Sequence, residues 1–199
     1  MTLLHIMLSL VLVLPGTSNE PTLKPHILTY IETYKYLAID EMDRSGIPAS
    51  VTLAQAILES NGGISKLARE SNNHFGIKCK DYWTGDRVLH PDDDRDAQGR
   101  IIPSCFRKYP SVAASYADRT EFLRKTPGYQ ILFDFDKTDY EAWSHGLQWC
   151  GYATDAAYGE KLIRTIELYG LDDLDYYTIK YYPKSGDQCE NGKSGNAGT

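Results

Sequence analysis

The segment "SVTLAQAILESNGG", residues Ser50 to Gly63, has the pattern of a helix that is buried on nearly all sides. Its apolar residues point in almost every direction around a helix of 3.6 residues per turn; they are Val51, Leu53, Ala54, Ala56, Ile57 and Leu58. Thr52, Gln55 and Glu59 follow one another at three- and four-residue steps and form a single polar stripe. The segment predicts a central helix with Ser50 as its N-cap that runs to about Ser60.

Glu59 lies in the last turn of this predicted helix. The negative end of the helix dipole and the apolar neighbours both disfavour the charged carboxylate, so its pKa should rise. A general acid that works near neutral pH needs such a rise. A glutamate near a helix end is most often solvated surface, so spacing alone leaves both interpretations open.

Asn61, Gly62 and Gly63 follow the acid directly. Glycine commonly ends a helix by adopting the left-handed conformation, which explains the pair without any function. In a second interpretation, backbone without side chains lets a polymer come close to Glu59.

The rest of the chain predicts further helices and one β-hairpin. Helical periodicity covers residues 25–45, 65–71, 111–126, 139–150 and 155–170, with Ser111 and Asp155 as caps. Between residues 81 and 108, Gly and Pro residues separate two short strand-like runs, "RVLH" and "RIIPSCFRKY". The predicted fold class is α+β, mainly α, with a small β-hairpin lobe.

The two ends of the chain differ in composition from the predicted domain between them. Residues 1–18 combine an apolar run with Gly16 and Ser18, and they predict a signal peptide and an exported protein; a short buried helix or an uncleaved anchor is the alternative. Residues 183–199 are rich in Gly, Ser, Asn and Lys and predict a flexible tail. One domain is expected at residues 25–175, as a monomer with no membrane span after processing.

The formal net charge of -6 provides no positive field for a phosphate backbone, so nucleic acid is not an expected partner. The four cysteines, Cys79, Cys105, Cys150 and Cys189, are far apart and lack metal-ligand spacing. In an exported chain they predict disulfides rather than a metal site, and no cofactor is indicated. Cys79 and Cys105 bracket the hairpin and are the expected pair; in a reducing compartment both are small buried residues.

Two further motifs follow "SVTLAQAILESNGG" along the chain: "NHFGIK" at residues 73–78 and "GYATDAAYGEKL" at residues 151–162. In this order, and within a match from Pro25 to Leu171, the three motifs resemble the peptidoglycan N-acetylglucosaminidases of glycoside hydrolase family 73. The resemblance implies a lysozyme-like helical domain and a substrate groove between it and the β-lobe. It also implies that Glu59 is the general acid that protonates the leaving glycosidic oxygen.

The resemblance further implies a second carboxylate in the β-lobe and a tyrosine beside the acid. Asp94, in "HPDDDRDAQG", lies nearest the expected position, with Asp92, Asp93 and Asp96 as alternatives. Tyr152 matches the tyrosine. Inversion and attack by the substrate's own N-acetyl group both remain open.

Candidate substrate-binding residues lie in the same motifs or line the expected groove. Sugar faces stack on aromatic rings, and amide or imidazole groups hydrogen-bond acetamido groups. Packing in the core, or fixing the turn before "FGIK", is the alternative role for each. The candidates are Gln55, Asn73, His74, Phe75, Trp83 and Tyr158.

The expected function is hydrolysis of the β-1,4 bond between N-acetylglucosamine and N-acetylmuramic acid in peptidoglycan, at a periplasmic, cell-envelope or extracellular location. A lytic transglycosylase or muramidase with the same fold is the enzymatic alternative. A cell-wall binding module without catalysis, or a scaffold for a cell-surface structure, is the alternative from another class.

Overall fold

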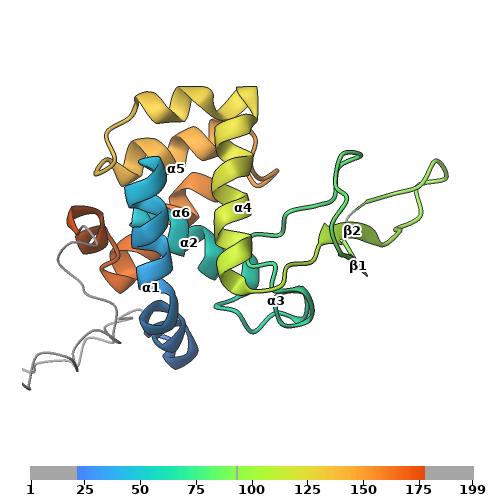
Figure 1. The fold of residues 1–199 in the computed structure, drawn as a ribbon, viewed down its shortest axis with the longest axis horizontal. Coiled ribbons are helices and arrows are strands. Elements are labelled where there is room, and N and C mark those ends of the chain that lie inside the picture. Colours follow the sequence, from blue (N-terminus) through green and yellow to red (C-terminus); the bar gives the residue numbers. More distant parts are fainter. Residues whose placement is uncertain (1–21, 93, 178–199) are drawn as a thin grey trace, which may run out of the picture.

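A computed structural model describes residues 22–92 and 94–177 (Figure 1). The helices in this part of the chain are α1 (Pro25–Ser45), α2 (Ala49–Ser60), α3 (Lys66–Ser71), α4 (Val112–Lys125), α5 (Tyr140–Trp149) and α6 (Tyr158–Tyr169), with 3-10 helices η1 (Pro127–Asp134) and η2 (Asp172–Tyr176). Strands β1 (Arg87–His90) and β2 (Ser104–Arg107) form a hairpin that projects away from the helical body (Figure 1). The predicted fold class is confirmed, although the sequence did not predict the two 3-10 helices.

Helix α2 lies in the middle of the helical body, in contact with α1, α5, α6 and η2. Val51, Leu53, Ala54 and Ala56 have no exposed surface, as the apolar pattern predicted. Leu58 differs, because 36% of its surface is exposed. The helix is therefore buried for most of its length and opens toward solvent only in its last turn.

The predicted N-cap of α2 is wrong. The helix begins at Ala49 and Pro48 occupies the N-cap position, so Ser50 lies inside the first turn. The carboxylate of Asp175, in η2, accepts hydrogen bonds from the Ser50 amide at 2.8 Å and from its hydroxyl at 2.5 Å. A residue 125 positions away thus satisfies the helix start, which no local pattern could reveal.

The other two predicted caps had different outcomes. Ser111 is confirmed as the N-cap of α4, since its side chain accepts a hydrogen bond from the Ala114 amide. Asp155 accepts from the Ala157 amide at 2.9 Å, but the N-cap of α6 is Ala157 itself. Asp155 therefore stabilises the turn before the helix rather than the helix start.

Asn61, Gly62 and Gly63 end α2 in the left-handed conformation, with φ angles of 50°, 61° and 78°. A β-carbon on Gly62 would lie 2.5 Å from the Ile27 side chain, and one on Gly63 would lie 3.1 Å from the Tyr30 ring. Both glycines therefore face α1. The expectation that they leave room for a polymer beside Glu59 is wrong, because the space in front of them is filled by that helix.

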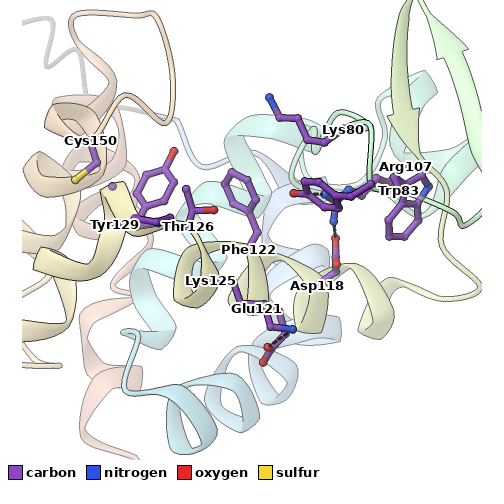
Figure 2. Close-up of a pocket in the computed structure, with 13 residues that line it drawn as sticks. Lys80, Trp83, Arg107, Asp118, Glu121, Phe122, Lys125, Thr126, Tyr129 and Cys150 are labelled. Atoms are coloured by element: carbon purple, nitrogen blue, oxygen red, sulfur yellow. Dashed lines mark hydrogen bonds and ion pairs between the residues drawn. The ribbon is translucent and has the colours of Figure 1, made fainter.

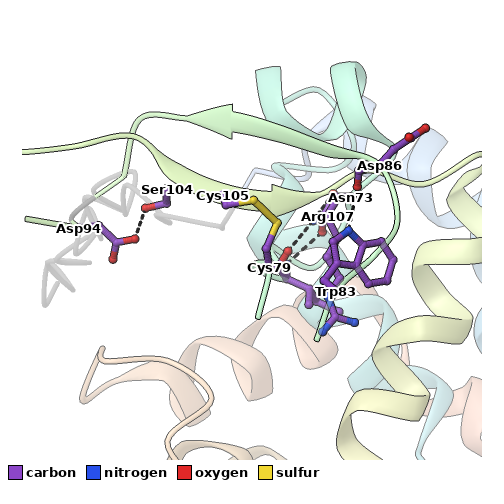
Figure 3. The surroundings of a disulfide bond; sticks show 9 residues. Asn73, Cys79, Trp83, Asp86, Asp94, Ser104, Cys105 and Arg107 are labelled. Atoms are coloured by element: carbon purple, nitrogen blue, oxygen red, sulfur yellow. Dashed lines mark hydrogen bonds between the residues drawn. A yellow bond between two sulfur atoms is a disulfide. The ribbon is translucent and has the colours of Figure 1, made fainter. Parts of the chain in front are cut away.

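A disulfide between Cys79 and Cys105 links the hairpin to the segment that precedes it (Figure 3). Strands β1 and β2 pair antiparallel from Arg87 opposite Arg107 to His90 opposite Ser104. The predicted pairing of these two cysteines is confirmed. Cys150 is a free thiol in the structure, and Cys189 lies outside the described residues.

No helix among residues 22–92 and 94–177 is long and apolar enough to cross a membrane. The predicted signal peptide at residues 1–18 and the predicted tail at residues 183–199 lie outside the described residues.

Replacing Asp175 by Ala should lower the free energy of unfolding by roughly 1–3 kcal/mol, because the Ser50 amide and hydroxyl lose their acceptor in a buried site. Urea denaturation followed by circular dichroism measures this loss. Asp173→Ala is the matched control, since Asp173 belongs to the same 3-10 helix but is exposed. Equal stability of the two variants would contradict the assigned capping role.

Candidate active site

A pocket of about 410 Å³ opens at the C-terminal end of α2, and we call it the Glu59 pocket. Its walls come from α2, the segment after α3, the β-lobe, α4, η1 and the loop between α5 and α6. The lining residues are Glu59, Phe75, Gly76, Ile77, Lys78, Lys80, Asp92, Phe122, Tyr129, Gly151, Tyr152, Ala153 and Thr154.

The two carboxyl oxygens of Glu59 have different surroundings. Oε1 accepts a hydrogen bond from the Tyr158 hydroxyl at 2.9 Å. Oε2 lies beside Gly76, where a β-carbon on that glycine would be 3.6 Å away. Burial raises the pKa of Glu59, in the direction that the sequence predicted, and the bond from Tyr158 opposes that rise. Glycine at position 76, with φ of 62°, keeps the wall beside Oε2 free of a side chain.

A line of buried polar side chains leads away from Glu59 into the core. The Gln55 side-chain amide donates to the Tyr158 hydroxyl at 3.0 Å, while its carbonyl oxygen accepts from Arg119 of α4. Arg119 also donates to the Thr52 hydroxyl at 3.1 Å. Gln55 was predicted to contact substrate, yet it is fully buried and both ends of its amide are occupied. The sequence also missed Arg119, although the stripe of Thr52 and Gln55 on a buried helix required some polar partner.

Tyr152 and Tyr158 stack on each other, with ring centroids 5.7 Å apart and an angle of 15° between the ring planes. Tyr152 lines the Glu59 pocket, and its hydroxyl donates to the Phe75 carbonyl at 3.3 Å. Burial raises the pKa of both tyrosines, so both hydroxyls keep their protons. The two predicted tyrosines are therefore brought together beside the acid as hydrogen-bond donors.

Asn73 and His74 point into the protein. The Asn73 amide donates to the carbonyls of Ile77 and Arg107, each at 2.9 Å, and its oxygen accepts from the Ile77 amide at 3.1 Å. His74 bonds the buried Tyr30 hydroxyl at 2.7 Å, and burial lowers its pKa to about 4, so it stays neutral. Both side chains are almost fully buried, and they fix the turn that presents Gly76 and Lys78.

Phe75 also packs inward. Its ring lies edge-on to Tyr116 with centroids 4.9 Å apart, and only 2% of its surface is exposed. Phe75 nevertheless lines the Glu59 pocket, to which its carbonyl contributes the acceptor for Tyr152. Stacking of a sugar on this ring is not compatible with its burial.

Lys78 holds two aspartates of the β-lobe, through ion pairs of 2.7 Å to Asp92 and 2.8 Å to Asp94. Asp92 lines the Glu59 pocket, whereas Asp94 does not. The Ser104 hydroxyl donates to Asp94 at 2.5 Å (Figure 3) and also lies within hydrogen-bond distance of Asp92, at 3.3 Å. The bonds from Lys78 and Ser104 lower the pKa of Asp94.

The other two aspartates that the sequence offered as alternatives are Asp96 and Asp93. Asp96 accepts from the Arg100 amide at 2.9 Å and pairs with its side chain at 2.7 Å, which closes the hairpin turn. Asp93 lies outside the described residues. In the part of the chain that the structure describes, no group of three His, Cys, Asp or Glu side chains could hold a metal ion.

A second cavity of about 740 Å³ continues from the Glu59 pocket, with Lys80, Phe122 and Tyr129 lining both (Figure 2). We call it the Trp83 pocket. The Arg107 guanidinium lies 4.6 Å from the centre of the Trp83 ring and pairs with Asp118 at 2.7 Å. Trp83 therefore lies in an extension of the pocket that holds the acid, along α4 and η1.

The chain matches the glucosaminidase family model, described as mannosyl-glycoprotein endo-beta-N-acetylglucosaminidase, over residues 35–171. Exo-glucosaminidase LytG of Bacillus subtilis is 35% identical over 130 residues, 63% of this chain and 45% of the relative. A probable N-acetylmuramidase of Lactococcus lactis is 34% identical over 152 residues, 73% of this chain and 34% of the relative.

A peptidoglycan hydrolase from Sphingomonas sp. A1 has a similar crystal structure, with a TM-score of 0.61 and 29% identity over 73% of this chain and 91% of that chain. The chain spans less than half the length of the two curated relatives. The family match covers the second half of α1, the helices from α2 to α6, the hairpin and both pockets. The chain therefore belongs to the glucosaminidase family, glycoside hydrolase family 73, as its motifs predicted.

Proposed function

We propose that this glycoside hydrolase cleaves peptidoglycan at the β-1,4 bond between N-acetylglucosamine and N-acetylmuramic acid, with Glu59 as general acid. The observation that carries the proposal is a carboxyl group with a raised pKa on the wall of a pocket that continues into a second cavity. The similar Sphingomonas structure, named a peptidoglycan hydrolase, supports the substrate class.

The reaction begins with transfer of a proton from Glu59 to the glycosidic oxygen of the leaving sugar. Burial raises the pKa of Glu59 and so favours the protonated form that a general acid needs, which an exposed position does not do. As the bond breaks, positive charge develops on the anomeric carbon and ring oxygen. A group on the opposite face of the sugar must then stabilise that charge or activate water.

Asp92 is the carboxylate that we favour for this second role, because it lines the Glu59 pocket and Asp94 does not. Lys78 pairs with Asp92 at 2.7 Å and so holds its carboxylate in place at the pocket. Tyr152 lines the same pocket and offers a neutral hydroxyl that can orient the substrate's acetamido group. Inversion by an activated water and attack by the acetamido oxygen are both compatible with these groups.

Peptidoglycan lies outside the cytoplasmic membrane, so the proposed substrate requires export. The apolar run and the small residues at positions 1–18 provide the expected signal, and the Cys79–Cys105 disulfide suits an oxidising compartment. We infer that the protein acts in the periplasm, in the cell envelope or outside the cell.

Replacing Glu59 by Gln should reduce the turnover of purified cell walls by a factor of about 10² to 10⁴, because the amide cannot donate an acidic proton. Loss of turbidity of a cell-wall suspension measures the rate. Glu70→Gln is the matched control, since Glu70 is an exposed glutamate near the end of α3. An unchanged rate for Glu59→Gln would favour a binding module that has lost catalysis.

The sugar at the new reducing end identifies the bond that is cut. We expect digests to carry reducing N-acetylglucosamine, which mass spectrometry after borohydride reduction detects as the corresponding alditol. Reducing N-acetylmuramic acid would instead favour the muramidase activity for which the Lactococcus lactis relative is named. Anhydro-muramic ends would identify a lytic transglycosylase.

Asp92→Asn should reduce the turnover number at least tenfold, while Asp94→Asn should leave it within about threefold, because only Asp92 lines the pocket. The pair is well matched, since both side chains bind Lys78 and each substitution removes one charge from the same lysine. The reverse order of effects would assign the second carboxylate to Asp94. Two nearly normal rates would favour attack by the substrate's own acetamido group.

A further inference from the structure

Arg119 is a fully buried cation whose side-chain hydrogen bonds, among residues 22–92 and 94–177, go to neutral groups, while the carboxylate of Glu41 acts on it only through its charge. Its guanidinium donates to the Thr52 hydroxyl and to the Gln55 carbonyl oxygen, which are both neutral, and lies 5.7 Å from the centre of the Phe75 ring. Burial of a charge is costly even when the charge is hydrogen-bonded, so a buried arginine at this place calls for a specific role. Its position, two hydrogen bonds away from Tyr158, suggests that role.

The donors and acceptors along this line allow only one direction. Arginine has donors and no acceptor, so it must bond the oxygen of the Gln55 amide. The nitrogen of that amide then faces Tyr158 and donates to its hydroxyl oxygen at 3.0 Å. Having accepted this bond, the Tyr158 hydroxyl directs its own proton to Oε1 of Glu59, 2.9 Å away.

We propose that Arg119 is a positioning residue that sets the direction of the Gln55 and Tyr158 hydrogen bonds and so keeps the acidic proton of Glu59 on Oε2. An oxygen that accepts the tyrosine proton cannot at the same time present its own proton along that line. Oε2 lies on the side of Gly76, which lines the Glu59 pocket. The relay therefore holds the proton on the oxygen that substrate can reach, and this role rests on the proposed function of Glu59 as general acid.

Other charged or titratable groups near Glu59 can also influence its pKa. Tyr152 and Tyr158 lie on the side of α6, and the remaining groups line the pocket from η1 and the β-lobe or lie behind Gln55. These remaining groups are Tyr129, Lys78, Lys80, Asp92 and Arg119. None of the substitutions below alters the groups on the pocket walls.

Gln55→Glu tests the direction of the relay while keeping the shape of the side chain. The new carboxylate can pair with Arg119, but it offers no donor to Tyr158, whose hydroxyl will then donate to residue 55 and no longer to Glu59. Loss of that bond should raise the pKa of Glu59 by about one unit. A carbon NMR titration of carboxyl-labelled glutamate measures this shift in free protein, so it requires no substrate.

The same change should appear in the rates. The alkaline limb of the profile of kcat/KM against pH follows the pKa of the acid in the free enzyme, so it should move upward by the same amount. The turnover number should fall roughly tenfold with little change in KM, because the proton is no longer confined to Oε2. Arg119→Met should act in the same direction, whereas Arg119→Lys still offers a donor to Gln55 and should restore most of the rate.

Tyr158→Phe separates the relay from a simple effect of charge. In a chain that carries this substitution, Gln55→Glu should add no further shift if it acts through the tyrosine, whereas an effect of charge alone would persist. Thr120→Val is the matched control, because Thr120 is a fully buried neighbour of Arg119 whose hydroxyl has no hydrogen-bond partner in the described chain. Its titration should match that of the unmodified protein.

The proposal would be overturned by an unchanged Glu59 pKa in a folded Gln55→Glu protein, or by a shift that persists with Tyr158→Phe. If Arg119→Met does not fold, the Gln55→Glu titration still decides. Failure of the proposed function looks different, because cell walls would then remain uncut by the unmodified protein or be cut equally well after Glu59→Gln.

Discussion

Burial of α2 is the constraint on which the rest of the structure depends. In a helix in contact with α1, α5, α6 and η2, each buried polar group without a partner would cost about 1–3 kcal/mol. Asp175 satisfies the helix start, Arg119 satisfies Thr52 and Gln55 in its middle, and Tyr158 satisfies Glu59 at its end. The polar stripe of α2 therefore determines which side chains η2, α4 and α6 must contribute, and these contacts position the acid.

The helices, the hairpin and the raised pKa of Glu59 were predictable because their signals are local. Apolar periodicity located the helices, Gly and Pro residues bounded the hairpin, and Glu59 stood out as an acidic residue in an apolar segment. The partners were not predictable in the same way. Asp175 lies 125 residues from Ser50 and Arg119 lies 64 residues from Gln55, and nothing in a neighbouring pattern connects such pairs. The expectation that Gly62 and Gly63 leave room for a polymer was wrong for a related reason, since both glycines pack against α1, which is distant in the sequence.

In the β-lobe, the family resemblance did not predict which aspartate lines the Glu59 pocket. Counting along an acidic run selected Asp94, but a shift of two residues in an irregular loop decides which carboxylate reaches a pocket. Lys78 gathers both Asp92 and Asp94, and the Cys79–Cys105 disulfide follows directly after it. The lysine is thus held at the base of the lobe by a covalent link. The positions of Asp92 and Asp94, the candidates for the proposed second carboxylate, therefore depend on Lys78 as well as on the sequence of the hairpin.

The acid itself depends on a balance between two opposing effects. Burial raises the pKa of Glu59 and stabilises its protonated form, whereas a fully solvated carboxyl is ionised at neutral pH. One hydrogen bond from Tyr158 opposes the burial without opening the site to water. In the relay that we propose, the buried guanidinium polarises the Gln55 amide and the Tyr158 hydroxyl in turn, which strengthens the bond to Glu59. By this proposal, a cation that touches neither Glu59 nor the pocket influences the strength of the acid.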